Sequence, residues 1–497
     1  MIRGLILTAF ITVFASVVTA SPVQGMESLF YDDLFHLDEL ESSGSGMFWD
    51  DMYTDSGFNT LFIPDSGVLG KDRWSLYPWL SGGLSSSRYI TDKNIFGAVG
   101  LTNDIKFRRL FIRQTLDVDT RYKNDTDYVW KKDRVAAGRI EEAYLHLDLP
   151  HSFIRFGRLN RNWGPFYNRS LILSSNTRTY DALEWKLESS FFEFRQMFSY
   201  FSYARDSHAA IDPSPANRYL TAHSLNFMIQ DWAVLGITET VLFNREGLPD
   251  FQYVNPFTIY TVTNTNTEGK GNLMLGLNWS IKPPFYKKLS FKGEVVFDDF
   301  QVDDEDAGDQ EPTHWGIDMG LYAHDFLPVD IRHALYTEYK YLSRWIYTVD
   351  NRNTRAGERY TYLGRSMGAA DNDYDRFLVG LDIAGSDFWT ASAGFSYRRE
   401  GGNTVMTPWN DDGGGSLGYR EETPLSDRDT LTRKIDLFFE GKFYFRKYIG
   451  FHARFDNVWE RDRGESWSYS PEIGVSLSTR YGFDLLFERF SQGAQGD

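Results

Sequence analysis

The fold is indicated most clearly by the stretch Glu142-Ala143-Tyr144-Leu145-His146-Leu147-Asp148-Leu149. Its apolar residues fall on one face of an extended chain, and its polar residues and tyrosine fall on the other. Side chains of a β-strand point alternately to the two faces of a sheet, so this period of two residues predicts a strand whose two sides meet different surroundings.

The same period recurs from about Trp74 onward, in runs separated by polar, Gly-rich or Asp/Asn-rich stretches. The runs predict roughly sixteen to twenty strands. Single-chain bacterial barrels have even strand numbers, so we expect about 18. The other runs lie at residues 110–119, 183–188, 191–203, 220–229, 233–243, 273–281, 289–298, 315–324, 333–342, 376–384, 389–398, 433–445, 448–458, 468–478 and 481–490.

Charged side chains lie well inside several predicted strands, on the polar face. Lys292, Glu294 and Asp298 share one such face. A polar lumen accommodates these charges, whereas lipid does not. Aromatic residues gather near strand ends, as in Trp74-Ser75-Leu76-Tyr77-Pro78-Trp79, which is typical of an interfacial girdle. The pattern therefore predicts an all-β fold, a single large antiparallel transmembrane β-barrel, and leaves a large β-sandwich open as the alternative.

The start of the chain has the features of an export signal. Met1-Ile2-Arg3 is a short basic start, residues 5–18 are apolar apart from Thr and Ser, and Val18-Thr19-Ala20 is a small-residue cleavage site. These features predict a secretory signal peptide over residues 1–20. A transmembrane anchor is the alternative, but the apolar run is shorter than the about 20 residues that a spanning helix needs.

The rest of the chain divides into three predicted parts. Residues 21–70 combine a weak helical period with a Ser/Gly-rich stretch, so we expect a small N-terminal periplasmic segment that is partly helical or disordered. Residues 71–490 form the predicted barrel, and residues 491–497 a C-terminal tail. The longest stretches between predicted strands are the candidate extracellular loops, at 204–218, 299–314, 350–375 and 401–430.

Composition excludes several classes of function. The 497 residues include 52 Lys and Arg against 69 Asp and Glu, which gives a net charge of −17. This acidic balance argues against a nucleic-acid binder, which needs a basic surface. The chain has no cysteine, which excludes disulfides, thiolate metal sites and catalytic thiols.

Three blocks of sequence carry a family resemblance. The first spans 156–178 and contains Phe156-Gly157-Arg158, Trp163-Gly164-Pro165 and Ser170-Leu171-Ile172-Leu173-Ser174-Ser175-Asn176. The second is Gly293-Glu294-Val295-Val296-Phe297-Asp298-Asp299-Phe300, and the third is Leu363-Gly364-Arg365-Ser366-Met367-Gly368. Together they resemble the capsule assembly Wzi family of outer-membrane proteins.

This resemblance implies a barrel of about 18 strands in the cell outer membrane, with a helical periplasmic element and a plugged lumen. It also implies a non-enzymatic, lectin-like role, in which the protein binds surface or capsular polysaccharide and helps its assembly or attachment at the cell exterior. The expected partners are this polysaccharide, outer-membrane lipid and the polysaccharide export machinery. We expect no nucleic-acid partner, and a monomer.

The candidate ligand-binding residues lie in the first two blocks. Arg and Asn side chains can hydrogen-bond sugar hydroxyls or carboxylates, and Trp offers a flat apolar face to a sugar ring. The alternative is structural, with arginines pairing to lumenal acids to hold a plug and Trp-Gly-Pro forming a turn. The candidates are Arg158, Arg161, Trp163, Asn176, Arg178, Glu294 and Asp298.

Metal and catalytic sites are weakly supported. Residues 298–311 contain eight acidic residues, which could bind Ca²⁺ or Mg²⁺, but their spacing favours a solvated acidic loop. The nine histidines form no HExxH pair and no GxSxG is present, so we expect no enzyme, no metal and no cofactor. A porin-like diffusion channel for small solutes or sugars is the alternative to polysaccharide binding, and an envelope hydrolase is a third possibility.

Overall fold

The computed structural model describes most of the chain from Arg73 onward. The described residues are 73–85, 95–120, 136–166, 170–201, 217–230, 232–266, 271–286, 288–299, 314–329, 331–349, 356–386, 389–407, 431–445, 449–462, 465–480 and 483–486. The predicted signal peptide (1–20), the predicted periplasmic segment (21–70) and the C-terminal tail (491–497) lie outside these residues and stay predictions.

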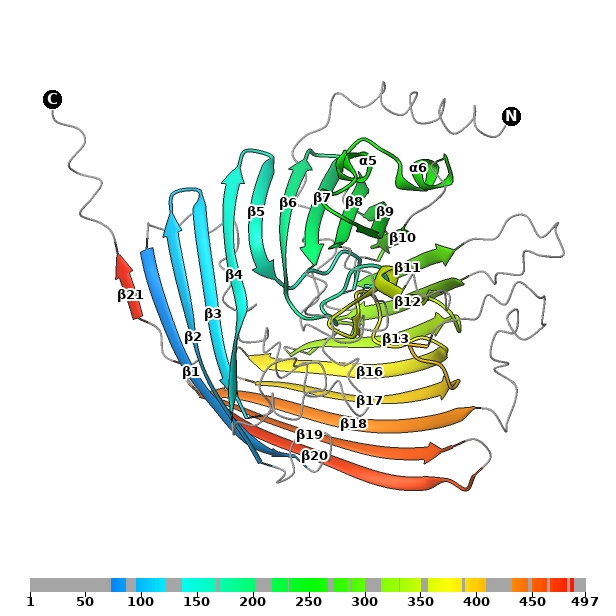
Figure 1. Ribbon diagram of the computed structural model, residues 1–497. Coiled ribbons are helices and arrows are strands. Elements are labelled where there is room, and N and C mark those ends of the chain that lie inside the picture. The colour runs from blue at the N-terminus through cyan, green and yellow to red at the C-terminus, as the bar shows by residue number, and fades with distance from the viewer. Residues whose placement is uncertain are drawn as a thin grey trace.

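All described strands except a short two-stranded hairpin form one closed antiparallel sheet (Figure 1). Neighbours in sequence are paired throughout, and β1 (Arg73–Ser85) pairs with both β2 (Ile95–Phe107) and β20 (Ser468–Arg480). The remaining wall strands are β3 (Leu110–Asp119), β4 (Ala137–Leu149), β5 (Ser152–Leu159), β6 (Tyr180–Glu188), β7 (Phe192–Phe201), β8 (Asn217–Ile229), β9 (Ala233–Arg245), β10 (Asn272–Ile281), β11 (Leu289–Asp299), β12 (His314–His324), β13 (Arg332–Leu342), β16 (Tyr374–Ser386), β17 (Trp389–Glu400), β18 (Thr432–Phe445) and β19 (Ile449–Arg461).

The wall has eighteen strands although the sheet has nineteen strand segments. The extra segment, β21 (Phe483–Leu486), continues β20 along β1 in one register, since Trp79 faces Arg480 and Leu76 faces Phe483. The described part of the run predicted at 481–490, Phe483–Leu486, is therefore the end of the closing strand and not a separate one. The all-β barrel of about 18 strands is confirmed, and the β-sandwich alternative is wrong.

The two ends of the barrel carry different connections. Three of the tight turns at one end place a non-glycine residue in the left-handed region, at Arg108, His151 and Gln230. The strand bounds put all four predicted long loops at the opposite end. Short turns are periplasmic and long loops extracellular in outer-membrane barrels, so β1 begins at the periplasmic end.

Alternation along the strands separates an apolar outer face from a polar inner face. On β18 and β19, Phe439 and Phe451 are exposed on the outside, whereas Arg454 and Asp456 are buried on the inside. Lys292 and Glu294, which share the inner face of β11, are each 1% exposed. Charges therefore lie inside the wall and hydrocarbon-compatible side chains outside, as the sequence predicts for a transmembrane barrel.

The aromatic stretch at the start of β1 divides between the two faces. Trp74 is on the outside and donates a hydrogen bond to Asn103. Trp79, an odd number of residues later, lies on the inner face, where its ring covers Gly100. Only one of these two tryptophans can therefore belong to an interfacial girdle.

Short elements complete the described structure. Two helices, α5 (Phe251–Val254) and α6 (Tyr260–Asn266), follow β9, and a 3₁₀ turn (Ala356–Glu358) with the small hairpin β14 (Thr361–Tyr362) and β15 (Arg365–Ser366) follows β13. Within the described part of the chain, no helix is long and apolar enough to cross a membrane.

The contact between Trp79 and Gly100 gives a test of the inner packing. A Cβ on Gly100 would lie 2.2 Å from Trp79 Cζ2 and 2.6 Å from the backbone oxygen of Leu116. We expect Gly100→Ala to lower the free energy of unfolding by about 1–3 kcal/mol, as overpacking does. Urea titrations of the folded barrel in lipid vesicles measure this. Gly97→Ala is the matched control, since a Cβ there meets nothing within 4 Å; equal stabilities of the two variants would contradict the assignment.

Candidate functional site

Two chain segments fold into the lumen from the extracellular end and form a plug. We define the plug as the described residues between β5 and β6, 160–166 and 170–179, and those between β13 and β16, 343–349 and 356–373. Most of its buried apolar residues belong to one cluster with inner-face residues of neighbouring wall strands. From the plug the cluster includes Leu171, Ile172, Ile346, Tyr347, Tyr360 and Met367, and from β7 to β11 it includes Met197, Leu220, Leu242, Met274 and Val296.

Backbone and side-chain hydrogen bonds join the two plug segments. The backbone N–H of Ser174 donates to the carbonyl of Met367 at 2.8 Å, and its hydroxyl donates to the carbonyl of Gly368 at 2.5 Å. Asn176 Nδ2 donates to the carbonyl of Ser366 at 2.9 Å. These bonds satisfy backbone groups that would otherwise be buried without partners, which is the condition for an irregular segment to lie inside a barrel.

Two buried tyrosines reinforce the junction. The hydroxyl of Tyr347 donates to the carbonyl of Leu171 at 2.7 Å, and that of Tyr360 donates to the carbonyl of Ile172 at 2.8 Å. Burial raises the pKa of both phenols well above the usual range. Both hydroxyls therefore stay protonated and remain donors.

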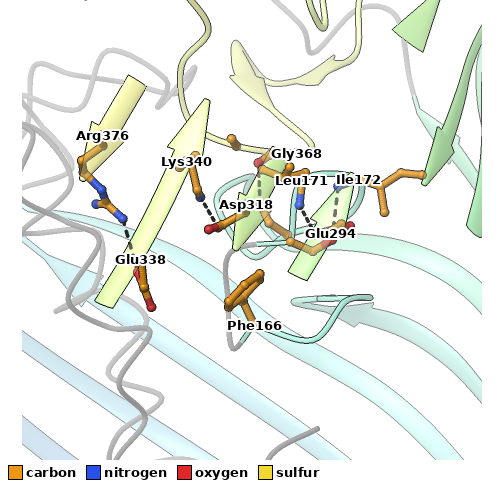
Figure 2. A network of polar contacts seen from close by, with 12 residues as sticks. Phe166, Leu171, Ile172, Glu294, Asp318, Glu338, Lys340, Gly368 and Arg376 are labelled. Carbon is orange, nitrogen blue, oxygen red and sulfur yellow. Dashed lines mark hydrogen bonds and ion pairs between the residues drawn. The ribbon is translucent and has the colours of Figure 1, made fainter. Parts of the chain in front are cut away.

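Glu294 on β11 holds the first plug segment against the wall (Figure 2). Its Oε1 accepts a hydrogen bond from the Ser170 hydroxyl at 2.8 Å, and its Oε2 accepts one from the backbone N–H of Leu171 at 2.7 Å. Asp298, on the same face of β11, accepts a hydrogen bond from the backbone N–H of Tyr347 at 2.6 Å. One strand therefore positions both plug segments, through carboxylates four residues apart in sequence.

Arg161 fixes the two ends of the first plug segment. Its guanidinium donates to the carbonyls of Gly157 and Leu159, where β5 ends, and to that of Tyr180, where β6 begins, at 2.8 to 3.2 Å. Its Nε lies 3.4 Å from Glu184 Oε2. All of these partners belong to the chain itself, so Arg161 is a positioning residue in this structure.

Arg218 on β8 anchors the second plug segment and was not among the predicted residues. It is 1% exposed and donates to the carbonyls of Gly357, Arg359 and Thr361 at 2.7, 3.0 and 2.7 Å. A lone arginine in a strand gives no sign of such a role. Only the fold brings it to carbonyls more than a hundred residues away in sequence.

The structure brings six of the seven predicted site residues to the plug or to the wall that holds it. Trp163 is 5% exposed within the apolar cluster, and Arg178 is 6% exposed. Arg158 is separate, because it lies on the outer face of β5, paired with Asp181 at 2.7 Å. Most of these residues are therefore placed to hold the plug, as the structural alternative expects. Asn176 is half-buried, whereas the other five of the six are buried.

Beyond Glu294 the inner wall carries paired charges of both signs. Lys340 Nζ lies 3.0 Å from Asp318 Oδ2, and Arg376 Nη2 lies 3.8 Å from Glu338 Oε2, as Figure 2 shows. Phe166 of the plug packs into an aromatic cluster beside them.

Among the described residues no group of three or more His, Asp and Glu side chains could hold a metal ion, and most of the acidic stretch 298–311 lies outside those residues.

Loss of the Glu294 carboxylate tests the plug. We expect Glu294→Ala to remove two buried hydrogen bonds and to raise the population with the plug released by about 5–30-fold, for a loss of about 1–2 kcal/mol. The natural chain has no cysteine, so the reaction of Ile172→Cys with a water-soluble maleimide reports release. Glu472→Ala, an inner-face glutamate on β20, is the control, and equal labelling rates in both backgrounds would exclude a holding role for Glu294.

The three sequence blocks that carry the family resemblance meet in this plug. Ser170 and Leu171 of the first block contact Glu294 of the second, and Ser174 contacts Gly368 of the third. Residues far apart in sequence therefore form one structural unit.

Comparison with known proteins agrees with this arrangement. The family model for capsule assembly protein Wzi matches residues 108–446, more than half of the chain. The solved structure of Wzi, described as an outer membrane protein involved in group 1 capsule assembly in Escherichia coli and as a carbohydrate binding β-barrel, is 12% identical. The match covers 94% of this chain and 100% of that chain, with a TM-score of 0.58.

Other solved barrels are more distant. Pseudomonas aeruginosa OprD is 11% identical over 86% of this chain and 99% of that chain, with a TM-score of 0.46. Acinetobacter baumannii OccAB4 is 10% identical over 84% and 100%, with a TM-score of 0.43. A search of curated protein sequences finds no match. On its fold and its family match, the chain is an outer-membrane β-barrel that belongs to the capsule assembly Wzi family.

Proposed function

We propose that this protein binds surface or capsular polysaccharide at the cell exterior, without catalysis, and helps its assembly or attachment. Membership of a capsule assembly family supports this proposal, as does the carbohydrate binding named for the similar Escherichia coli barrel. The proposal requires a surface at the extracellular mouth that suits a polysaccharide.

The charge of the plug is the observation that carries the proposal. The described residues of the two plug segments include five arginines and three acidic residues, in a chain whose net charge is −17. An excess of arginine at one site in an acidic protein favours an anionic ligand, because guanidinium groups bind carboxylates in a bidentate geometry. We therefore expect an acidic polysaccharide.

The β14–β15 hairpin presents part of this surface. Tyr362 lies 4.6 Å, between ring centroids, from Phe201, the last residue of β7, so the hairpin lies at the extracellular end of the wall. Arg365 and Asn176 are both half-buried. The Asn176 side chain donates a hydrogen bond to the backbone carbonyl of Ser366, which follows Arg365 in β15. We propose that these side chains contact the sugar.

The other predicted residues act indirectly in this proposal. Arg161, Trp163, Arg178, Glu294 and Asp298 keep the plug in place, and their substitution weakens sugar binding by moving the plug. Arg158 on the outer wall has no part in it. We further propose a monomer surrounded by outer-membrane lipid, with the export machinery reached from the periplasmic end.

A glycan retention assay tests the proposed surface. We expect purified Arg365→Ala to retain less acidic polysaccharide of the source cell than the unmodified protein, and high salt to reduce retention in both, because exposed charges are screened. Arg158→Ala is the matched control, since it removes an arginine from the outer wall. Equal losses in the two variants, or no retention by the unmodified protein, would count against the proposal.

The alternative of a porin-like channel makes an electrical prediction. Because the plug lies in the lumen, we expect the protein to show no steady conductance in planar lipid bilayers, and Glu294→Ala to show intermittent openings as the plug moves. A stable conductance of the unmodified protein would favour the diffusion channel and exclude a closed plug.

A further inference from the structure

Part of the outer wall is covered by the chain itself. Residues 246–266, which include α5 and α6 (Figure 1), are called the external clasp here. They lie against the outer face of β7 to β10. Tyr253 and Tyr260 of the clasp pack on Tyr219, Val241 and Phe243, all at most 5% exposed. The outer-face residues nearer the periplasmic end, Leu235 and Ile237, stay exposed at 44% and 39%.

A hydrogen-bonded histidine–glutamate pair lies beneath the clasp, on the side of the wall where apolar residues are expected. His223 Nε2 lies 2.8 Å from Glu239 Oε2. The same carboxylate accepts hydrogen bonds from the backbone N–H of Tyr260 at 2.9 Å and of Thr261 at 3.3 Å. The ring of Tyr260 stacks on His223, with centroids 4.1 Å apart. The clasp therefore donates hydrogen bonds to the Glu239 carboxylate and covers both side chains, which could not face hydrocarbon.

The His223–Glu239 pair lies at the depth of the bilayer. His223 is the seventh residue of β8, which has thirteen. A strand of that length, rising about 3.4 Å per residue and tilted about 40°, spans roughly 34 Å along the barrel axis, and the lipid-facing band is about 25 Å tall. The middle of β8 therefore lies within the band, and the clasp descends from the extracellular end to that level.

The surface of the clasp that faces away from the wall is apolar. Phe251, Phe257, Ile259 and Val262 are 70%, 86%, 59% and 53% exposed. Between residues 247 and 266 the only charged residue is Asp250, which is paired with Arg245 at 2.8 Å. An extracellular loop in water does not present four large apolar side chains with so few charges.

We propose that the external clasp is inserted in the outer leaflet and that its exposed apolar face contacts lipid acyl chains. Three observations support this occupant: the depth of the covered His223–Glu239 pair, the continuity of the clasp with the lipid-facing residues Leu235 and Ile237, and the absence of any charged residue other than Asp250 between residues 247 and 266. The clasp then lets β8 and β9 carry a polar pair at membrane depth. A second copy of the chain packed on the same face is the competing occupant.

Single-cysteine spin labelling tests this proposal, since the chain has no cysteine of its own. Nitroxides are placed at Phe257→Cys and Val262→Cys in the full-length protein, reconstituted in vesicles that contain lipopolysaccharide. Leu235→Cys on the lipid-facing wall and Thr404→Cys in an exposed extracellular segment are the reference sites.

We expect both clasp labels to be accessible to oxygen and protected from a water-soluble nickel chelate. The ratio of oxygen accessibility to nickel accessibility should be similar to that at Leu235 and several-fold above that at Thr404. A ratio like that at Thr404 would place the clasp in water and overturn the proposal. Protection from both reagents, together with spin–spin broadening or disulfide-linked dimers through Phe257→Cys, would also overturn it, in favour of a second copy.

Discussion

The plug depends on a buried carboxylate of the wall. Glu294 is 1% exposed and would lose several kcal/mol of hydration without partners. The Ser170 hydroxyl and the Leu171 backbone N–H replace that hydration. The dependence is mutual, because the plug backbone lies where water is scarce and needs an acceptor from the wall. The plug and β11 are therefore stable only together, and Asp298 repeats the arrangement for the second segment.

Closure of the sheet makes this arrangement possible. A closed sheet has no free edge, so each strand needs only to suit its two faces. On β7 to β11 the inner face is partly apolar and packs against the plug, through Met197, Leu242 and Met274 among others. Elsewhere the inner face carries pairs such as Arg454 with Asp456 at 2.8 Å. Apolar inner residues therefore mark the part of the wall that the plug covers.

The sequence predicted the wall better than the plug. A period of two residues is a local property, so the barrel, its strand number and the inward side of Glu294 followed from the pattern. β2 was missed because Gly97, Gly100 and several polar residues interrupt its alternation. Contacts such as that of Arg218 with Gly357 join segments with no local signal in common. Arg158 and Arg161 looked equivalent in sequence, but the first belongs to the strand, where alternation turns it outward, and the second follows the strand's end.

The same alternation also marks places where the wall is not in contact with lipid. His223 and Glu239 have the parity of outer-face residues, yet both are ionisable and face each other across β8 and β9. An ionisable pair on the lipid side at mid-strand requires a cover. The aromatic stretch after β9, whose charged residues are Glu246 and Asp250, is the nearest segment in sequence that could supply one. A polar pair on the outer face of a strand therefore predicts a segment that covers it. A long apolar loop beside the strand in turn predicts polar residues beneath it. The structure joins them through Glu239 and the first backbone N–H groups of α6.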